Sequence, residues 1–249
     1  MFRLKHLALA SALLMSAVSA QAASTEDTLK KQFSSMFPQA EVQGVTGTDL
    51  KGIYQVEMAN GQLLYMSQDG KFAFTGDMMR LESGNAVNVS EEWRSVRRVD
   101  SLKSLDDKDL VVFPAKGDEK AEVLVFTDTS CGYCRKFHSE IPAITKQGIT
   151  VKYVAWPRYG VDSPAGRTMV NVWCSDDRLD AMSQAKSNKD VSKPKGQACK
   201  DEGSVVQAQI DLGRSIGVNG TPAVYTLDGK QLGGYVPADQ LTKQLGLDK

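Results

Sequence analysis

The stretch Val-Leu-Val-Phe-Thr-Asp-Thr-Ser-Cys-Gly-Tyr-Cys, which runs from Val123 to Cys134, decides the fold of the second half of the chain. Its β-branched and aromatic start over residues 123–126 is typical of a buried strand. Turn-forming and helix-capping residues follow at 127–130, so we expect Cys131 in the first turn of a helix. Two cysteines three residues apart lie on one helical turn, close enough for a disulfide.

The position of Cys131 at a helix start indicates redox chemistry. Unpaired N–H groups and the positive end of the helix dipole favour a thiolate there. A structural zinc site and a permanent disulfide are the alternatives to a redox-active pair. Zinc needs two more ligands, and beyond the leader the chain offers only Cys174, Cys199 and His138, with no second close cysteine pair. We therefore expect a dithiol that works without a metal or a cofactor.

The first residues predict export. Arg3 and Lys5 precede an apolar run over 7–18, and Ala-Gln-Ala at 20–22 is typical of a signal peptidase site. The run is too short to span a bilayer, so we interpret residues 1–22 as a cleaved signal rather than as an anchor helix. An exported chain is allowed to form disulfides.

The charge balance points to no polyanionic partner. The chain has 30 basic and 30 acidic residues and a formal net charge of 0. Such a balance offers no electrostatic attraction for nucleic acid, and we expect none to bind.

The region 23–83 has the pattern of a small antiparallel sheet with one helix. Asn60-Gly61 and Asp69-Gly70 are strong hairpin signals between short apolar runs. The expected elements are a helix over 26–37 and strands over 41–45, 53–58, 63–67 and 71–74.

A helical linker is expected over residues 84–108. Asn88 followed by Glu91 resembles a capping box, after Gly84 has ended the sheet. We interpret the basic residues of this helix as a solvated face rather than as a site for an anionic partner; they are Arg94, Arg97 and Arg98.

The remainder, residues 109–249, alternates strands and helices in a layered α/β pattern, which makes the whole chain α+β. Residues 162–216 are polar and rich in helix signals, so they form a helical insertion between strands. The expected strands are 110–113, 123–126, 149–155, 223–227 and 232–235, and a final helix covers 238–247.

Four motifs in this order and spacing resemble the DsbC/DsbG family of periplasmic thiol:disulfide interchange proteins. They are Phe126-Thr127-Asp128, Cys131-Gly132-Tyr133-Cys134, Trp173-Cys174 and Gly220-Thr221-Pro222-Ala223. The likeness covers nearly the whole chain after the signal, although the DsbG type carries Pro where Gly132 stands. It implies a thioredoxin-like domain with an inserted helical subdomain, and a homodimer joined through residues 23–83.

The resemblance also implies roles for single residues. Cys131 would attack a substrate disulfide and Cys134 would resolve the mixed disulfide. A cis Thr221-Pro222 bond would lie beside them and help bind substrate, together with Gly220 and Tyr133. Cys174 and Cys199 would form a structural disulfide. Asp128 and His138 would tune the site, or would be a turn residue and a helix histidine whose ring is fully hydrogen-bonded.

The implied function is a periplasmic disulfide isomerase and reductase that acts on misfolded or wrongly disulfide-bonded exported proteins. The implied partner is an inner-membrane thiol–disulfide reductase of the DsbD type, which would donate electrons. A dithiol oxidase and a chaperone that holds unfolded chains are the alternatives.

Overall fold

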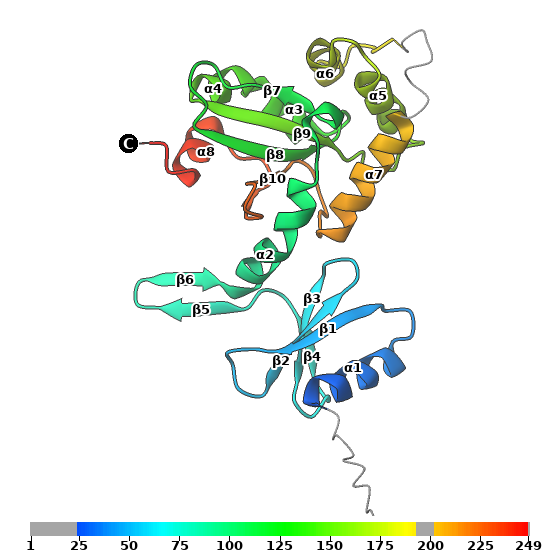
Figure 1. Cartoon of the computed structure of the whole chain (residues 1–249), viewed down its shortest axis with the longest axis vertical. Helices are drawn as coiled ribbons and strands as arrows, with labels where there is room; N and C mark the ends of the chain where they lie inside the picture. The colour runs from blue at the N-terminus through cyan, green and yellow to red at the C-terminus, as the bar shows by residue number, and fades with distance from the viewer. Residues whose placement is uncertain (1–23, 193–201, 249) are drawn as a thin grey trace, which may run out of the picture.

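The structure is a computed structural model that describes residues 24–192 and 202–248, and Figure 1 shows two bodies joined by one helix. The predicted signal segment, residues 1–22, lies outside the described residues. In the part of the chain that is described, no helix is both long and apolar enough to cross a membrane.

The N-terminal body is an antiparallel sheet in the order β1-β2-β3-β4, with one helix packed on it. Both predicted hairpin turns are confirmed, because Gly61 and Gly70 take φ values of +76° and +67° between the paired strands. The elements are α1 (Thr25–Met36), β1 (Val42–Gly47), β2 (Ile53–Met58), β3 (Leu63–Ser67) and β4 (Ala73–Thr75).

A two-stranded ribbon corrects the expected start of the linker. The strands β5 (Met79–Glu82) and β6 (Asn85–Asn88) pair through a turn at Gly84, whose φ is +84°. The segment 84–88 was predicted as part of the helical linker, and that prediction is wrong, because Gly84 turns the chain back on itself instead of ending the sheet.

The linker helix α2 (Val89–Lys103) begins where the capping signal predicted. Asn88 is its N-cap and accepts a hydrogen bond from the Glu91 N–H at 2.8 Å. A short 3-10 helix, η1 (Asp107–Asp109), follows before the second sheet.

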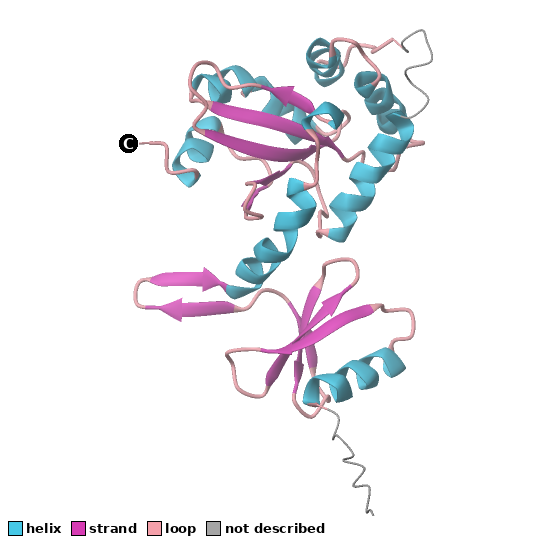
Figure 2. Cartoon of the chain, viewed as in Figure 1, coloured by secondary structure: helices cyan, strands magenta, loops and turns pink. Residues whose placement is uncertain are grey.

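The C-terminal body is a five-stranded sheet in the order β11-β10-β8-β9-β7, in which β8 and β9 are parallel (Figure 2). Its strands are β7 (Val111–Phe113), β8 (Ala121–Thr127), β9 (Ile149–Ala155), β10 (Ala223–Tyr225) and β11 (Gln231–Gly233). Its helices are α3 (Gly132–Ser139), α4 (Ile141–Lys146), α5 (Pro164–Trp173), α6 (Arg178–Lys186), α7 (Glu202–Ser215) and α8 (Ala238–Gln244).

The alternation of β8 side chains builds two apolar layers. Val123 and Val125 pack in the core that includes Phe137 of α3, whereas Leu124 and Phe126 pack on the opposite side. The second layer also holds side chains from α2 and from the loop after α7, so the linker is part of the C-terminal core. The carboxyl end of β8 thereby presents the loop that leads into α3.

The basic residues of α2 do not form the solvated face that was predicted. Arg98 is buried, with 3% of its surface exposed, while Arg94 pairs with Asp77 at 2.9 Å and Arg97 pairs with Glu57. The prediction was wrong for Arg94 and Arg98, because their side chains meet carboxylates and carbonyls supplied by other elements, which the helical pattern alone does not reveal. Arg97 is exposed, as predicted.

Candidate active site

The cysteine pair lies at the start of α3. Cys131 is the N-cap residue, and its Sγ accepts a hydrogen bond from the Cys134 N–H at 3.4 Å. Both thiols are free; Cys131 is 4% exposed and Cys134 is fully buried. The first cysteine is therefore the more accessible of the two, as its place at the helix start predicts.

The loop of residues 220–222, which precedes β10, lies next to this cysteine pair. β10 runs antiparallel to β8, with Ala223 opposite Phe126, which brings the residues before β10 next to the loop after β8. The Thr221-Pro222 bond is cis, as the family resemblance implied. The Cys131 thiol donates to the Thr221 carbonyl oxygen at 3.2 Å.

The surroundings of Cys131 favour its thiolate. Burial alone would raise the pKa of this thiol, but the nearby Thr221 side chain and the hydrogen bond from the Cys134 N–H outweigh it. The positive charge of Arg158 acts in the same direction, and the pKa of Cys131 falls below its ordinary value. The side chain is thus prepared to act as a nucleophile.

Cys134 is in the opposite state. Burial raises the pKa of its thiol above the ordinary value, although the charge of Lys186 opposes that effect. The pair therefore combines a more acidic, slightly exposed thiol with a less acidic, fully buried one.

Asp128 is a turn residue that carries an ion pair. Its Oδ1 accepts from the Ser130 N–H at 2.6 Å, and its Oδ2 accepts from Arg158 Nε at 3.0 Å. Burial alone would raise the pKa of this carboxyl, but the hydrogen bonds from Arg158 and Ser130 lower it. An ionised carboxylate held in this way orders the loop before Cys131 and places Arg158 near the thiol.

His138 lies one turn beyond Cys134, and both of its ring nitrogens have partners. Nδ1 is 3.1 Å from the Tyr153 hydroxyl, and Nε2 is 3.3 Å from Ser183 Oγ. Burial and the charge of Lys186 lower the pKa of His138 to about 4. The imidazole is therefore neutral near pH 7 and is satisfied by its neighbours.

Of the predicted substrate-binding residues, Tyr133 is exposed, Gly220 and Thr221 are half-buried, and Pro222 is buried. Tyr133 is 64% exposed, and its ring centroid lies 6.0 Å from that of Tyr235. The space that a side chain at Gly220 would fill is empty, so the backbone there is open to approach by another chain.

Of the two remaining cysteines, the structure describes Cys174 but not Cys199. Cys174, at the end of α5, is disulfide-bonded and not a free thiol. Cys199 lies outside the described residues, so its pairing with Cys174 stays a prediction.

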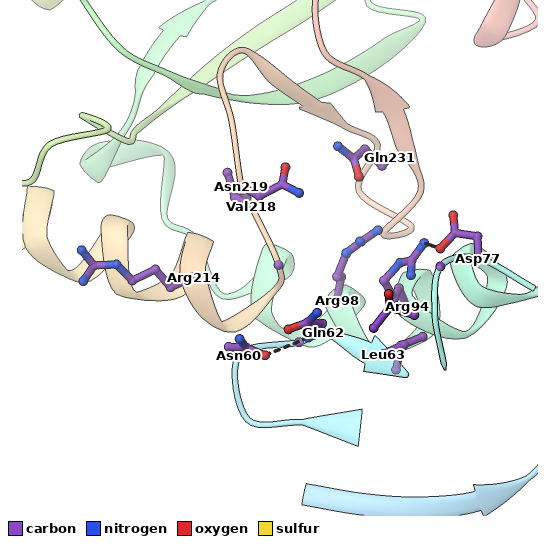
Figure 3. A pocket seen from close by; sticks show the side chains of 14 residues that line it. Asn60, Gln62, Leu63, Asp77, Arg94, Arg98, Arg214, Val218, Asn219 and Gln231 are labelled. Atoms are coloured by element: carbon purple, nitrogen blue, oxygen red, sulfur yellow. Dashed lines mark hydrogen bonds and ion pairs between the residues drawn. The ribbon is translucent and has the colours of Figure 1, made fainter. Parts of the chain in front are cut away.

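A cavity of about 790 Å³ lies between the two bodies and is not part of this site. Figure 3 shows Asn60 and Gln62, from the turn between β2 and β3, below Arg98 of α2, which extends towards Gln231, with Arg214 of α7 to one side. None of its lining residues belongs to the cysteine pair or to the segment 220–222.

The sequence alone did not indicate two charged residues that lie near the thiols. Arg158 follows a strand end marked by Trp156-Pro157, and Lys186 ends a polar helix in the insertion. Neither belongs to a motif. Only the folded arrangement brings their charges to the cysteines.

The fold and the paired thiols define a thiol–disulfide exchange protein of the thioredoxin class. Family models match in both halves: a disulfide bond isomerase protein N-terminal domain over residues 19–91 and a thioredoxin-like domain over residues 107–247. The chain belongs to the DsbC family of thiol:disulfide interchange proteins.

Individual relatives agree with this placement. The thiol:disulfide interchange protein DsbC of Dickeya dadantii is 35% identical over 205 residues, which cover 82% of this chain and 81% of that protein. The protein of the same name from Pasteurella multocida is 36% identical, with 80% of this chain and 82% of that protein covered. A crystal structure of a disulfide interchange protein from Neisseria gonorrhoeae is 25% identical, with a TM-score of 0.47, and covers 57% of this chain and 96% of that chain.

Proposed function

We propose that this protein is a periplasmic disulfide isomerase and reductase that rearranges wrong disulfides in exported proteins. The observation that carries the proposal is the asymmetry of the cysteine pair. Cys131 is reduced, stabilised as a thiolate and placed at the helix start, and the buried thiol of Cys134 stands one turn behind it. A thiol–disulfide exchange protein needs one thiol that attacks the substrate disulfide and a second that can later attack the mixed disulfide.

The reaction begins when the Cys131 thiolate attacks a sulfur of a substrate disulfide. A mixed disulfide forms, and the other substrate sulfur leaves as a thiolate. If a second substrate thiolate then attacks the substrate sulfur, a new substrate disulfide forms and Cys131 is released, which is isomerisation. If Cys134 attacks Cys131 instead, the substrate leaves reduced and the pair is oxidised.

The rim around the pair supports peptide binding. An extended substrate segment would lie along residues 220–222 and hydrogen-bond to the main chain there. The exposed ring of Tyr133 offers apolar and stacking contact beside the attacking sulfur. The accessible backbone at Gly220 supports the same docking position.

We also propose a homodimer that is paired through the N-terminal sheet. The edge strand β4 is exposed along its length; Phe72, next to it, is 70% exposed, and Phe74, within it, is 48% exposed. Free strand edges and exposed aromatic rings are surfaces that proteins cover by association. Two cysteine pairs facing one cleft would raise the effective concentration of active sites around a bound chain.

Two further roles complete the proposal. An inner-membrane thiol–disulfide reductase of the DsbD type would return electrons to the oxidised pair, which the reductase branch requires. Cys199 would be the partner of Cys174, because the other two of the chain's four cysteines carry free thiols. The subdomain bond would then stay closed while the pair at α3 cycles.

The test is the refolding of a small protein with scrambled disulfides, with Cys131→Ser as the variant. We expect the wild-type protein to restore activity to the substrate and Cys131→Ser to lose that ability. A variant as effective as wild type would instead support a chaperone that holds unfolded chains. A strongly oxidising reduction potential, with oxidation of reduced substrate, would support a dithiol oxidase.

A further inference from the structure

A buried lysine lies behind the cysteine pair. Lys186 ends α6 and is 4% exposed, yet among the described residues no carboxylate lies within ion-pair distance of its Nζ. Its Nζ donates to Thr127 Oγ1 at 2.6 Å and to the Asp128 carbonyl at 2.9 Å. A buried amine without an anionic partner is costly to a fold, and such groups gather at functional sites.

The two acceptors place the amine directly beneath the active loop. Thr127 ends β8, and the Asp128 carbonyl that binds Lys186 also accepts from the Cys131 N–H at 3.3 Å. Helix α6 packs against α3, which carries Cys134 on its buried face. The positive end of Lys186 therefore lies on the interior side of the pair, opposite the side that a substrate approaches.

We propose that Lys186, acting through the Thr127 hydroxyl, is the positioning residue that lets buried Cys134 ionise and resolve the mixed disulfide. This inference rests on the proposed function, because it needs Cys134 as the resolving thiol. This inference assigns a role to the buried Lys186 amine, which neither orders the substrate-binding residues nor forms an ion pair with a carboxylate of the described residues.

The step balances in atoms and electrons. Neutral Lys186 accepts the Cys134 proton by way of the Thr127 hydroxyl, which leaves an ammonium and a thiolate. The Cys134 sulfur attacks Cys131 Sγ, the bond between Cys131 and the substrate sulfur breaks, and that sulfur leaves as a thiolate. The pair is oxidised to a disulfide and the substrate cysteine is reduced. Lys186 then returns its proton to water.

The pKa directions of the two groups agree with this role. Burial lowers the pKa of Lys186 to about 8, so a useful fraction of the amine is neutral near pH 7. The Lys186 charge in turn lowers the pKa of Cys134 against the effect of burial, and the Thr127 hydroxyl lowers it further.

The other titratable groups around the amine do not contribute to the pH dependence expected from Lys186. The pKa of His138 is about 4, that of Tyr153 is raised well above its ordinary range by burial, and arginine stays protonated. Between about pH 6 and pH 10 the groups that change charge there are thus Lys186 and the thiols. The groups that face Lys186 are Cys131, Cys134, Arg135 and His138 from α3, Asp128 from the preceding loop and Tyr153 from β9.

The test follows one turnover with a small aromatic disulfide whose released thiolate is coloured. The first release reports attack by Cys131, and the second reports resolution by Cys134. We expect Lys186→Met to slow the second release about tenfold near neutral pH and to move its pH midpoint up by about one unit. The first release should keep its rate, and Lys186→Arg, whose guanidinium stays protonated and cannot accept the Cys134 proton, should not recover the second.

The control is Lys189→Met, three residues beyond the end of α6, where the lysine is exposed. It should match the wild-type protein in both releases. A second release in Lys186→Met that is unchanged, or that slows by the same factor as the first, would overturn the proposal. If Lys186→Met does not fold, Thr127→Val removes the connecting hydroxyl and must slow the second release selectively for the proposal to stand.

The same experiment separates this inference from the proposed function. If the wild-type protein shows no second release that depends on Cys134, then Cys134 is not the resolving thiol and the reductase branch of the proposed function is wrong. If that release exists and ignores Lys186, the function stands and only the role of the lysine is lost.

Discussion

Arg98 Nε, in the linker helix, donates to the Ile216 carbonyl oxygen at 3.1 Å, across 118 positions of sequence. Its Nη1 also meets Glu91 Oε1 at 2.6 Å, and the same Glu91 oxygen accepts from the Gln231 N–H at 2.9 Å. The guanidinium lies 5.1 Å from the Tyr225 ring centroid. One buried cation thus fixes α2 to the end of α7 and to the β10–β11 hairpin.

This arrangement predicts that Arg98→Ala weakens the hold between the linker and the C-terminal body. The change leaves Glu91 and the Ile216 carbonyl without their buried donor, so we expect a loss of about 3 kcal/mol in the free energy of unfolding. Urea unfolding measures it. The matched control is Arg97→Ala, whose side chain is 51% exposed and pairs with Glu57. Loss of that surface pair should cost about 1 kcal/mol or less, and equal losses in the two variants would show that the buried contacts of Arg98 do not hold the linker.

The second prediction concerns the two thiols separately. In Cys134→Ser, the remaining Cys131 should titrate below about pH 8.5, the ordinary value of a free cysteine, because its surroundings lower its pKa. In Cys131→Ser, the remaining Cys134 should titrate above that value, because burial raises its pKa. Thiolate absorbance follows both. The order of the two midpoints is the result that matters, and a reversed order would remove Cys131 as the activated thiol.

The lowered pKa of Cys131 also makes the stability of the reduced protein depend on pH. Below the folded pKa both states hold the proton, so the thiol contributes nothing. As the pH rises from there towards about 8.5, the folded protein is deprotonated first and becomes more stable, and the gain is then complete. Reduced wild type should show this rise and Cys131→Ser should not, in urea unfolding at a series of pH values.

His138 gives a fourth prediction, on the acid side. Its folded pKa is about 4, because burial and Lys186 disfavour the imidazolium, whereas an unfolded histidine titrates near 6.5. The unfolded state therefore takes up a proton first, and stability falls as the pH drops from about 6.5 to about 4, by about 3 kcal/mol at most.

His138→Gln should lose this part of the acid sensitivity while keeping a polar group near Tyr153. The chain has two histidines, and the other lies in the predicted signal segment, so the ring-proton NMR signal of the mature protein belongs to His138. A ring that titrates near pH 6.5 would show that the side chain is solvated and would contradict the buried site described here.

Much of the C-terminal body could be predicted because its strands are continuous apolar runs. β9 occupies Ile149–Ala155, the predicted range, since both of its faces are covered. The hairpin turns followed from Asn-Gly and Asp-Gly pairs, which are favoured there for a local conformational reason. The capping of α2 by Asn88 is local as well.

The features that the sequence did not predict lack such local signals. The β5–β6 ribbon exposes Leu81, at 81%, and Met79, at 45%, so it carries no alternation of buried and exposed residues to read. Arg98 and Lys186 look like ordinary surface cations, and their burial is decided by elements far away in sequence. Cys131 could be found because its motif is local, whereas the charges that tune it are not.

The last prediction tests the proposed dimer. Phe72 stands next to the exposed edge strand β4 and is 70% exposed, so pairing through that edge would bury it. Phe72→Asp would place a charge in the interface, and we expect the variant to sediment as a monomer. Leu50→Asp, at an exposed apolar position between β1 and β2 (58% exposed), is the matched control and should stay dimeric.

Both variants should reduce a small disulfide at the wild-type rate, because the cysteine pair at α3 is untouched. Only Phe72→Asp should lose the rescue of scrambled substrates, by about tenfold or more, since one site alone cannot supply the effective concentration of two. A monomeric Phe72→Asp that isomerises as well as wild type would show that the dimeric cleft has no part in the mechanism.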